Sequence, residues 1–122
     1  MCLLPLAGLA AIALAAPAFA ADYPISGRFG QSASTTKGAI DCTGKRVMSF
    51  SGNQRTDSKG GVPAYRNKSV RVDGAGRYRV VDEFTTGQQA FAYANYTLHV
   101  IDTDHIELRM QPGGTIKLQR CK

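Results

Sequence analysis

The sequence lacks the local motifs by which common enzyme classes are identified. It contains no Gly-x-Ser-x-Gly elbow, no P-loop, no dinucleotide-binding fingerprint and no zinc-ligand spacing. Only two histidines occur, His99 and His105. We therefore expect a protein that is not an enzyme and that holds neither a metal ion nor a cofactor.

Helical patterning is also scarce. No window sustains the 3.6-residue spacing of apolar side chains, and glycines interrupt the chain at short intervals. Short segments that alternate between apolar and polar residues are instead separated by turn-forming residues, which is typical of seven or eight β-strands. The predicted fold is all-β, a small closed antiparallel up-and-down barrel, with a β-sandwich as the alternative.

Residues 1–20 carry no charged side chain and end in Pro17-Ala18-Phe19-Ala20. An apolar core followed by small residues predicts a signal peptide that is cut after Ala20. The usual positively charged start is missing, so a membrane anchor is kept as the alternative. We expect residues 21–122 to form one periplasmic or secreted domain, with no stable membrane insertion once the leader is removed.

Cysteine usage supports the same compartment. Cys2 would leave with the leader, so the mature chain would hold only Cys42 and Cys121. Two cysteines in an oxidising compartment predict a disulfide. It would close a loop of about 80 residues and fasten an early part of the chain to the last strand.

The alternation in the second half of the chain also predicts how its strands pair. Apolar residues occupy even positions on both sides of Asp102–Asp104, and a slip by one residue would turn one set to the wrong face. Val100 is therefore expected opposite Ile106, across a three-residue loop. In this register His99 faces Glu107, which makes a cross-strand pair a simpler interpretation than a metal site.

The same parity rule applies to two other hairpins. Around Gly74–Gly76 it sets Val72 opposite Tyr78. Around Pro112–Gly114 it sets Leu108 opposite Leu118, so that Arg120 would lie opposite Ile106. That register also brings His105 opposite Cys121, a neighbourhood that we interpret as an accident of the disulfide and not as a catalytic dyad.

Upstream of these hairpins the pattern is weaker. Residues 25–31, 39–42 and 46–51 are expected to be strands, and residues 53–61 the longest loop. Asp82 alternates with apolar neighbours and would face inward with Arg66 or Lys68 as its partner, unless a bulge turns it to solvent.

One short motif carries a family resemblance. Gly27-Arg28-Phe29 resembles the Gly-x-Trp opening of the lipocalin and calycin barrels, and small secreted bacterial barrels share this outline. The resemblance implies that an arginine on the last strand packs across the aromatic ring where the barrel closes. Arg120 is placed to do so, which makes Gly27, Phe29 and Arg120 the expected barrel-closing residues.

The outer face offers the best indication of a binding surface. The chain has 15 Lys and Arg against 9 Asp and Glu, for a formal net charge of +6. Arg71 and Arg79 would lie opposite each other, close to Arg77, and such like charges cost stability unless an anion is bound. Solvated arginines are the plainer interpretation.

Phe91 and Tyr93 would join this outer face if the alternation around them holds, and a bulge near Asn95 would turn them into the core. We therefore expect a secreted binding module that contacts a protein or an anionic envelope component and not nucleic acid. An inhibitor of a secreted hydrolase is one version. The alternative is a carrier of a small apolar ligand inside the barrel.

Overall fold

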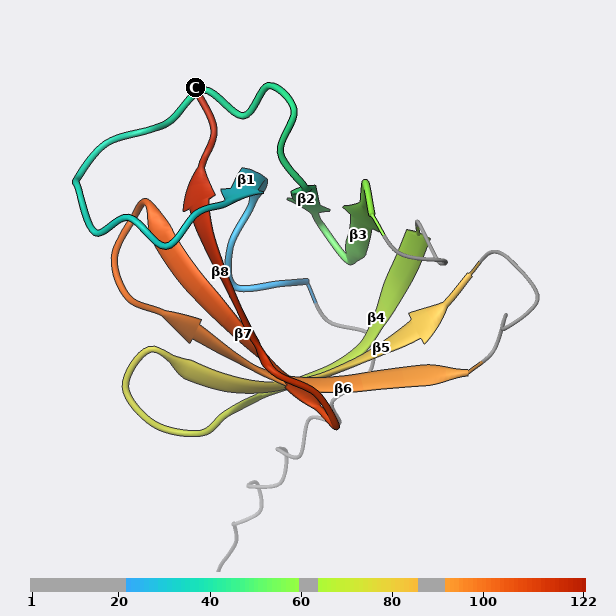
Figure 1. Cartoon of the computed structure of the whole chain (residues 1–122). Coiled ribbons are helices and arrows are strands. Elements are labelled where there is room, and N and C mark those ends of the chain that lie inside the picture. Colours follow the sequence, from blue (N-terminus) through green and yellow to red (C-terminus); the bar gives the residue numbers. More distant parts are fainter. Residues whose placement is uncertain (1–21, 60–63, 86–91) are drawn as a thin grey trace, which may run out of the picture.

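A computed structural model describes residues 22–59, 64–85 and 92–122 of the chain, and these residues form a closed all-β barrel (Figure 1). Each strand pairs antiparallel with the next, and β1 pairs with β8 to close the cylinder. The predicted up-and-down barrel is confirmed, and the sandwich is not adopted. The strands are β1 (Gly27–Gln31), β2 (Val47–Ser51), β3 (Gln54–Asp57), β4 (Ala64–Val72), β5 (Arg77–Phe84), β6 (Tyr93–Val100), β7 (His105–Gln111) and β8 (Thr115–Arg120).

Two expectations fall outside the described residues: the leader in residues 1–20 and the orientation of Phe91. Within the three described ranges, no helix has the length and hydropathy needed to span a membrane.

The first two hairpins have the predicted register. Val100 pairs with Ile106 across the three-residue loop 102–104. Val72 pairs with Tyr78 across the other loop, and the backbone at Gly76 has φ +68°, a left-handed conformation that suits glycine. The apolar alternation was therefore sufficient to predict which residues meet in these hairpins.

The third hairpin was predicted two residues out of register. Leu108 pairs with Ile116, and Ile106 pairs with Leu118. A shift by two residues keeps every side chain on its face, so the apolar pattern could not distinguish the two registers. As a result His105 pairs with Gln119 and not with Cys121.

The prediction of a long loop at residues 53–61 was also wrong. Gln54–Asp57 forms β3, which pairs with β2 and β4. Both inward side chains of this strand, Arg55 and Asp57, are charged and buried. Since the strand presents no apolar alternation, its sequence has the composition of a loop.

Apolar side chains of several strands fill much of the barrel, and the core residues are Tyr23, Phe29, Met48, Phe50, Val80, Tyr96, Leu98, Ile106, Leu108 and Leu118. An ion pair lies among them. Arg55 is 1% exposed, and its Nε donates a hydrogen bond of 2.8 Å to Oδ2 of the fully buried Asp82. The guanidinium also lies 3.8 Å from the centre of the Tyr65 ring.

Asp82 faces inward as predicted, but its partner is Arg55 and not Arg66 or Lys68. The irregularity in the β4–β5 pairing lies between Asn67 and Ser69, on the strand opposite. Lys68 is exposed, and Arg66 pairs with Glu83 on the outer side. The bulge therefore turns a lysine to solvent and leaves the carboxylate buried.

Cys42 and Cys121 form the predicted disulfide, with their Cα atoms 5.6 Å apart. The strand expected at 39–42 is reduced to a single bridge between Ile40 and Cys121. The disulfide therefore holds the connection between β1 and β2 against the end of β8, close to the C-terminus in Figure 1.

Arg120 stacks on Phe29 where β1 meets β8. Its guanidinium carbon lies 4.6 Å from the ring centre, and the two residues are direct partners across the strands. Arg120 Nε donates to the carbonyl oxygen of Thr103, and Nη1 donates to that of Ser26. The arginine thus joins three segments of the chain at the closure.

Gly27 leaves the space that Arg120 occupies. A Cβ atom at this position would lie 2.5 Å from Nη1 of Arg120, and the backbone has φ +114°. We expect Gly27→Ala to lower the free energy of unfolding by about 2 kcal/mol, because both the arginine and the backbone must shift. Urea unfolding measures the loss.

Gly44→Ala is the matched control. Gly44 also has a positive φ, +76°, but a Cβ atom there meets nothing within 4 Å. Its loss should therefore be smaller, since it reports backbone strain alone. Equal losses in the two variants would contradict the part assigned to Arg120.

Candidate functional site

The outer face of β4 to β7 carries a row of arginines. Arg71 on β4 is the direct partner of Arg79 on β5, as the sequence predicted. Arg79 in turn pairs with Thr97 on β6, and Thr97 pairs with Arg109 on β7. Adjacent strands are about 4.8 Å apart, so the backbone positions of the three arginines span roughly 14 Å across the sheet. We call Arg71, Arg79 and Arg109 the arginine row.

No acidic residue occupies this row. The acid that pairs with it is Asp73, whose Oδ2 lies 3.5 Å from Nε of Arg79. Both partners are exposed, with 64% of the Arg79 side chain and 51% of the Asp73 side chain accessible. A surface ion pair at this distance contributes little, so the positive charge of the row remains available to a ligand.

A groove of about 440 Å³ runs along the outer face beside the row, lined by Ser69, Arg71, Arg79, Val80, Val81, Asn95, Tyr96, Thr97 and Gln111. Ser69, which lines the groove, lies at the irregularity of β4. The lining combines two arginines with amide and hydroxyl groups.

The other predicted surface residues are more dispersed. Arg77 pairs with His99 and lies one row further along, beside a separate depression of about 20 Å³. Tyr93 faces outward and is 55% exposed, which follows from a regular β5–β6 pairing without a bulge near Asn95. Neither residue lines the groove.

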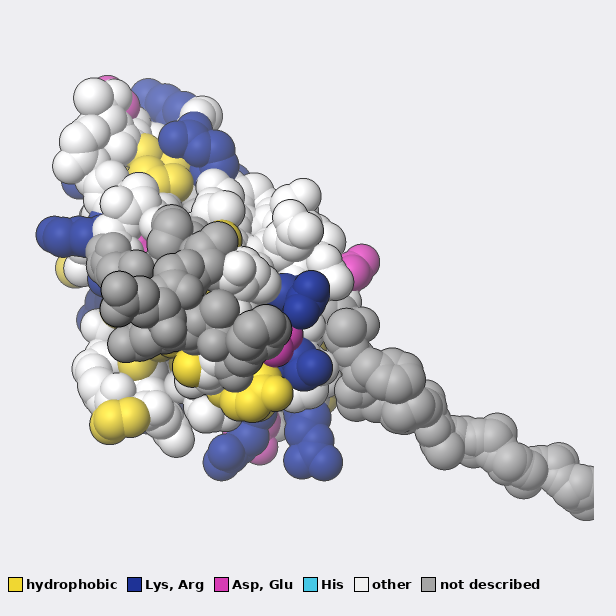
Figure 2. Space-filling model, turned by 90° about the vertical axis from the view of Figure 1, so that its right-hand side faces the viewer, with side chains coloured by type: hydrophobic (Ala, Val, Ile, Leu, Met, Phe, Trp, Pro, Cys, Tyr) yellow, Lys and Arg dark blue, Asp and Glu magenta, His cyan; other side chains and the backbone are white. Residues whose placement is uncertain are grey.

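The wider surface agrees with this distribution of charge. Figure 2 views the end of the barrel where β4, β5 and β6 lie in Figure 1, and it shows more Lys and Arg than Asp and Glu side chains around the rim. This end of the barrel is therefore predominantly basic.

Sequence reasoning selected only Arg71 and Arg79 of this site and missed the others, among them Thr97, Arg109 and Gln111. The signal for Arg109 was present, since the register that sets Val100 opposite Ile106 also sets Thr97 opposite Arg109. The pairing of Arg79 with Thr97 was not accessible, because β5 and β6 are joined by a connection without a clear turn signal.

The histidines have different environments. His99 faces Glu107 across β6 and β7, as predicted. His105 is buried beside Asp102, and no cluster of three or more potential metal ligands occurs within residues 22–59, 64–85 and 92–122.

Comparison with models of protein families, with curated proteins and with solved structures gave no match. The class of this protein is therefore defined only by its fold and by the groove on its surface. The chain is a disulfide-linked, closed eight-stranded β-barrel with a basic groove on its outer face.

Proposed function

We propose that this protein is a secreted or periplasmic, non-enzymatic binding module that contacts an anionic envelope component through the arginine row. The observation that carries the proposal is the direct pairing of Arg71 with Arg79 beside a groove. Two like charges opposite each other repel, and an anion between them would convert this repulsion into charge-assisted hydrogen bonds. The disulfide supports an oxidising compartment.

The filled barrel supports an external site over the alternative, a carrier of a small apolar ligand. Arg55 and Asp82 occupy the interior together with Tyr96, whose hydroxyl donates a hydrogen bond of 2.8 Å to Asp82. An apolar ligand would have to displace this paired charge, which is costly. Native mass spectrometry of protein purified from its own envelope distinguishes the two functions, since a retained small molecule would favour the carrier.

A protein partner with an acidic surface, such as a secreted hydrolase that the module inhibits, would use the same row of charges. Kinship with lipocalin-like barrels is part of the proposal and rests on Gly27, Phe29 and Arg120 at the closure. The binding of a polyanion to the arginine row requires neither the hydrolase partner nor the lipocalin kinship.

The double variant Arg71→Gln/Arg79→Gln tests the arginine row. We expect its affinity for heparin, used as a polyanion probe, to fall by about tenfold or more at low salt, because two charge-assisted contacts are lost. Isothermal titration calorimetry at several salt concentrations measures the affinity and its salt dependence. The dependence on salt should also become weaker in the variant.

The matched control is Lys37→Gln/Lys45→Gln, which removes the same net charge from two exposed lysines outside the row. It should bind heparin nearly as tightly as the unmodified protein. An equal loss in both double variants would mean that only net charge matters. If the unmodified protein did not bind heparin, the proposed anion-binding function would be wrong.

A further inference from the structure

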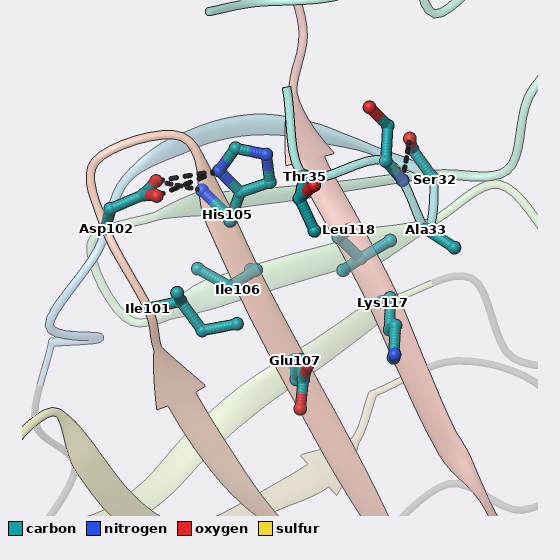
Figure 3. Close-up of a pocket in the computed structure, with 11 residues that line it drawn as sticks. Ser32, Ala33, Thr35, Ile101, Asp102, His105, Ile106, Glu107, Lys117 and Leu118 are labelled. Atoms are coloured by element: carbon teal, nitrogen blue, oxygen red, sulfur yellow. Dashed lines mark hydrogen bonds and ion pairs between the residues drawn. The ribbon is translucent and has the colours of Figure 1, made fainter. Parts of the chain in front are cut away.

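A small cavity lies beneath the segment that follows β1. His105 and Gln119 occupy outward-facing positions on β7 and β8, yet both are buried. Gln119 Nε2 donates hydrogen bonds to the carbonyl oxygens of Thr36 and Gly38, which holds this segment over the two strands. The cavity has a volume of about 100 Å³ (Figure 3) and is lined by Ser32, Ala33, Ser34, Thr35, Ile101, Asp102, His105, Ile106, Glu107, Lys117 and Leu118.

Asp102 fixes the ring of His105. Its Oδ1 lies 2.8 Å from Nδ1 of the histidine and also accepts the backbone N–H groups of Asp104 and His105. These hydrogen bonds, that from the His105 side chain first, lower the pKa of Asp102, so it accepts as a carboxylate. Nδ1 therefore carries a proton, and in the neutral ring Nε2 presents a lone pair.

That lone pair has no partner within the described part of the chain. The His105 side chain is only 10% exposed, and its Nε2 is buried. Figure 3 shows the ring turned with Nδ1 toward Asp102 and its other nitrogen toward the side of the cavity where Thr35 lies. A buried acceptor without a donor costs free energy, which a ligand with a hydroxyl or amide proton would recover.

The charges around the cavity restrict the ligand. Two carboxylates, of Asp102 and Glu107, line it against one ammonium group, of Lys117. The lining therefore offers an anion little net attraction. Ile101, which is 49% exposed, adds apolar wall, so the complementary group is neutral, carries a donor and has an apolar side.

We propose that this cavity binds one unit of a neutral carbohydrate, with a sugar hydroxyl or acetamide N–H donating to Nε2 of His105. The volume accommodates a group the size of a few water molecules, which corresponds to one edge of a sugar ring. The C–H groups of the sugar would lie against Ile101. The site shares no residue with the groove at the arginine row, so it is independent of the proposed function.

Nitrogen chemical shifts of the imidazoles test the site directly. The full mature chain, labelled with ¹⁵N-histidine, is titrated with N-acetylglucosamine and separately with its trimer, and His99→Gln assigns the two rings. We expect a saturable shift of the His105 Nε2 signal while His99 stays constant. A response to the monomer indicates a free sugar as the source, and a response to the trimer alone indicates a glycan chain; either supports the site.

Ala33→Leu is the blocking variant, because Ala33 lines the cavity and a leucine there would narrow it without removing a polar side chain. Binding should weaken about fivefold or more. Arg71→Gln/Arg79→Gln should bind the sugar as the unmodified protein does.

Three results would overturn the proposal: no shift with either sugar, a shift with sodium phosphate while both sugars are silent, or undiminished binding by Ala33→Leu. Because none of these depends on heparin binding, the carbohydrate site and the arginine row can fail separately.

Discussion

Asp82→Ala is expected to lower the free energy of unfolding by about 3–5 kcal/mol, because it leaves the guanidinium of Arg55 buried without a counter-charge. The Arg55 and Asp82 side chains are 1% and 0% exposed, so water cannot replace the lost partner. Small domains are stable by about 5–15 kcal/mol, and the variant would therefore lose a large part of its stability. Urea unfolding followed by circular dichroism measures the change.

The surroundings of the pair explain this large effect. Oδ2 of Asp82 accepts hydrogen bonds from Arg55 and Tyr96, and Oδ1 accepts one of 3.2 Å from Asn67. Burial lowers the pKa of Arg55, but the neighbouring Tyr96 and the carboxylate of Asp82 outweigh it and raise the pKa above its ordinary value. An arginine guanidinium stays protonated in proteins even without a counter-charge, so the variant cannot relieve the loss by deprotonation.

Two further variants make the first prediction specific. Asp73→Ala removes the exposed partner of Arg79 and should cost less than about 0.5 kcal/mol. Replacing both members of the buried pair, as in Arg55→Met/Asp82→Leu, should recover much of the loss, since apolar side chains of similar volume are often tolerated there. If Asp82→Ala unfolded at the same urea concentration as Asp73→Ala, the pair would have no structural importance.

The second large effect is expected from the disulfide. Replacing both Cys42 and Cys121 with alanine should lower the free energy of unfolding by about 4 kcal/mol, because the crosslink closes a loop between residues 79 apart in sequence and restricts the unfolded chain. Thermal unfolding of the double variant, compared with the oxidised protein, measures the loss.

Reduction of the unmodified protein with dithiothreitol is the companion experiment and should give a similar loss. The single variant Cys42→Ser would leave Cys121 as an unpaired thiol and serves as the control for intermolecular crosslinking. An unchanged unfolding midpoint after complete reduction, verified by mass, would show that the crosslink does not stabilise the barrel.

How far the sequence predicted the fold depended on whether the inward-facing residues were apolar. Leu98, Leu108 and their neighbours alternate with polar residues, and this pattern was sufficient to predict two hairpins and the barrel class. The strand β3 was missed because its inward residues, Arg55 and Asp57, are charged. Such residues are compatible with a core only beside charged partners from other segments, here Asp82 on β5 and Arg46 just before β2.

The candidate site was likewise predicted only in part. The sequence by itself determined that Arg71 and Arg79 lie opposite each other, since a three-residue loop and an apolar row fix that pairing. It also predicted the pairing of Cys42 with Cys121, on the expectation that Cys2 leaves with the leader. These are properties of local alternation and of residue count.

Only the tertiary structure decided the rest. The last hairpin could have had either of two registers that place every side chain on the same face, and only the structure shows which one it has. Residues 32–38 lie over the outward position of His105 and bury this side chain. The tertiary structure also selected Arg55 as the partner of Asp82. Alternation specifies which face a side chain takes, whereas contacts between distant segments depend on how the closed sheet brings them together.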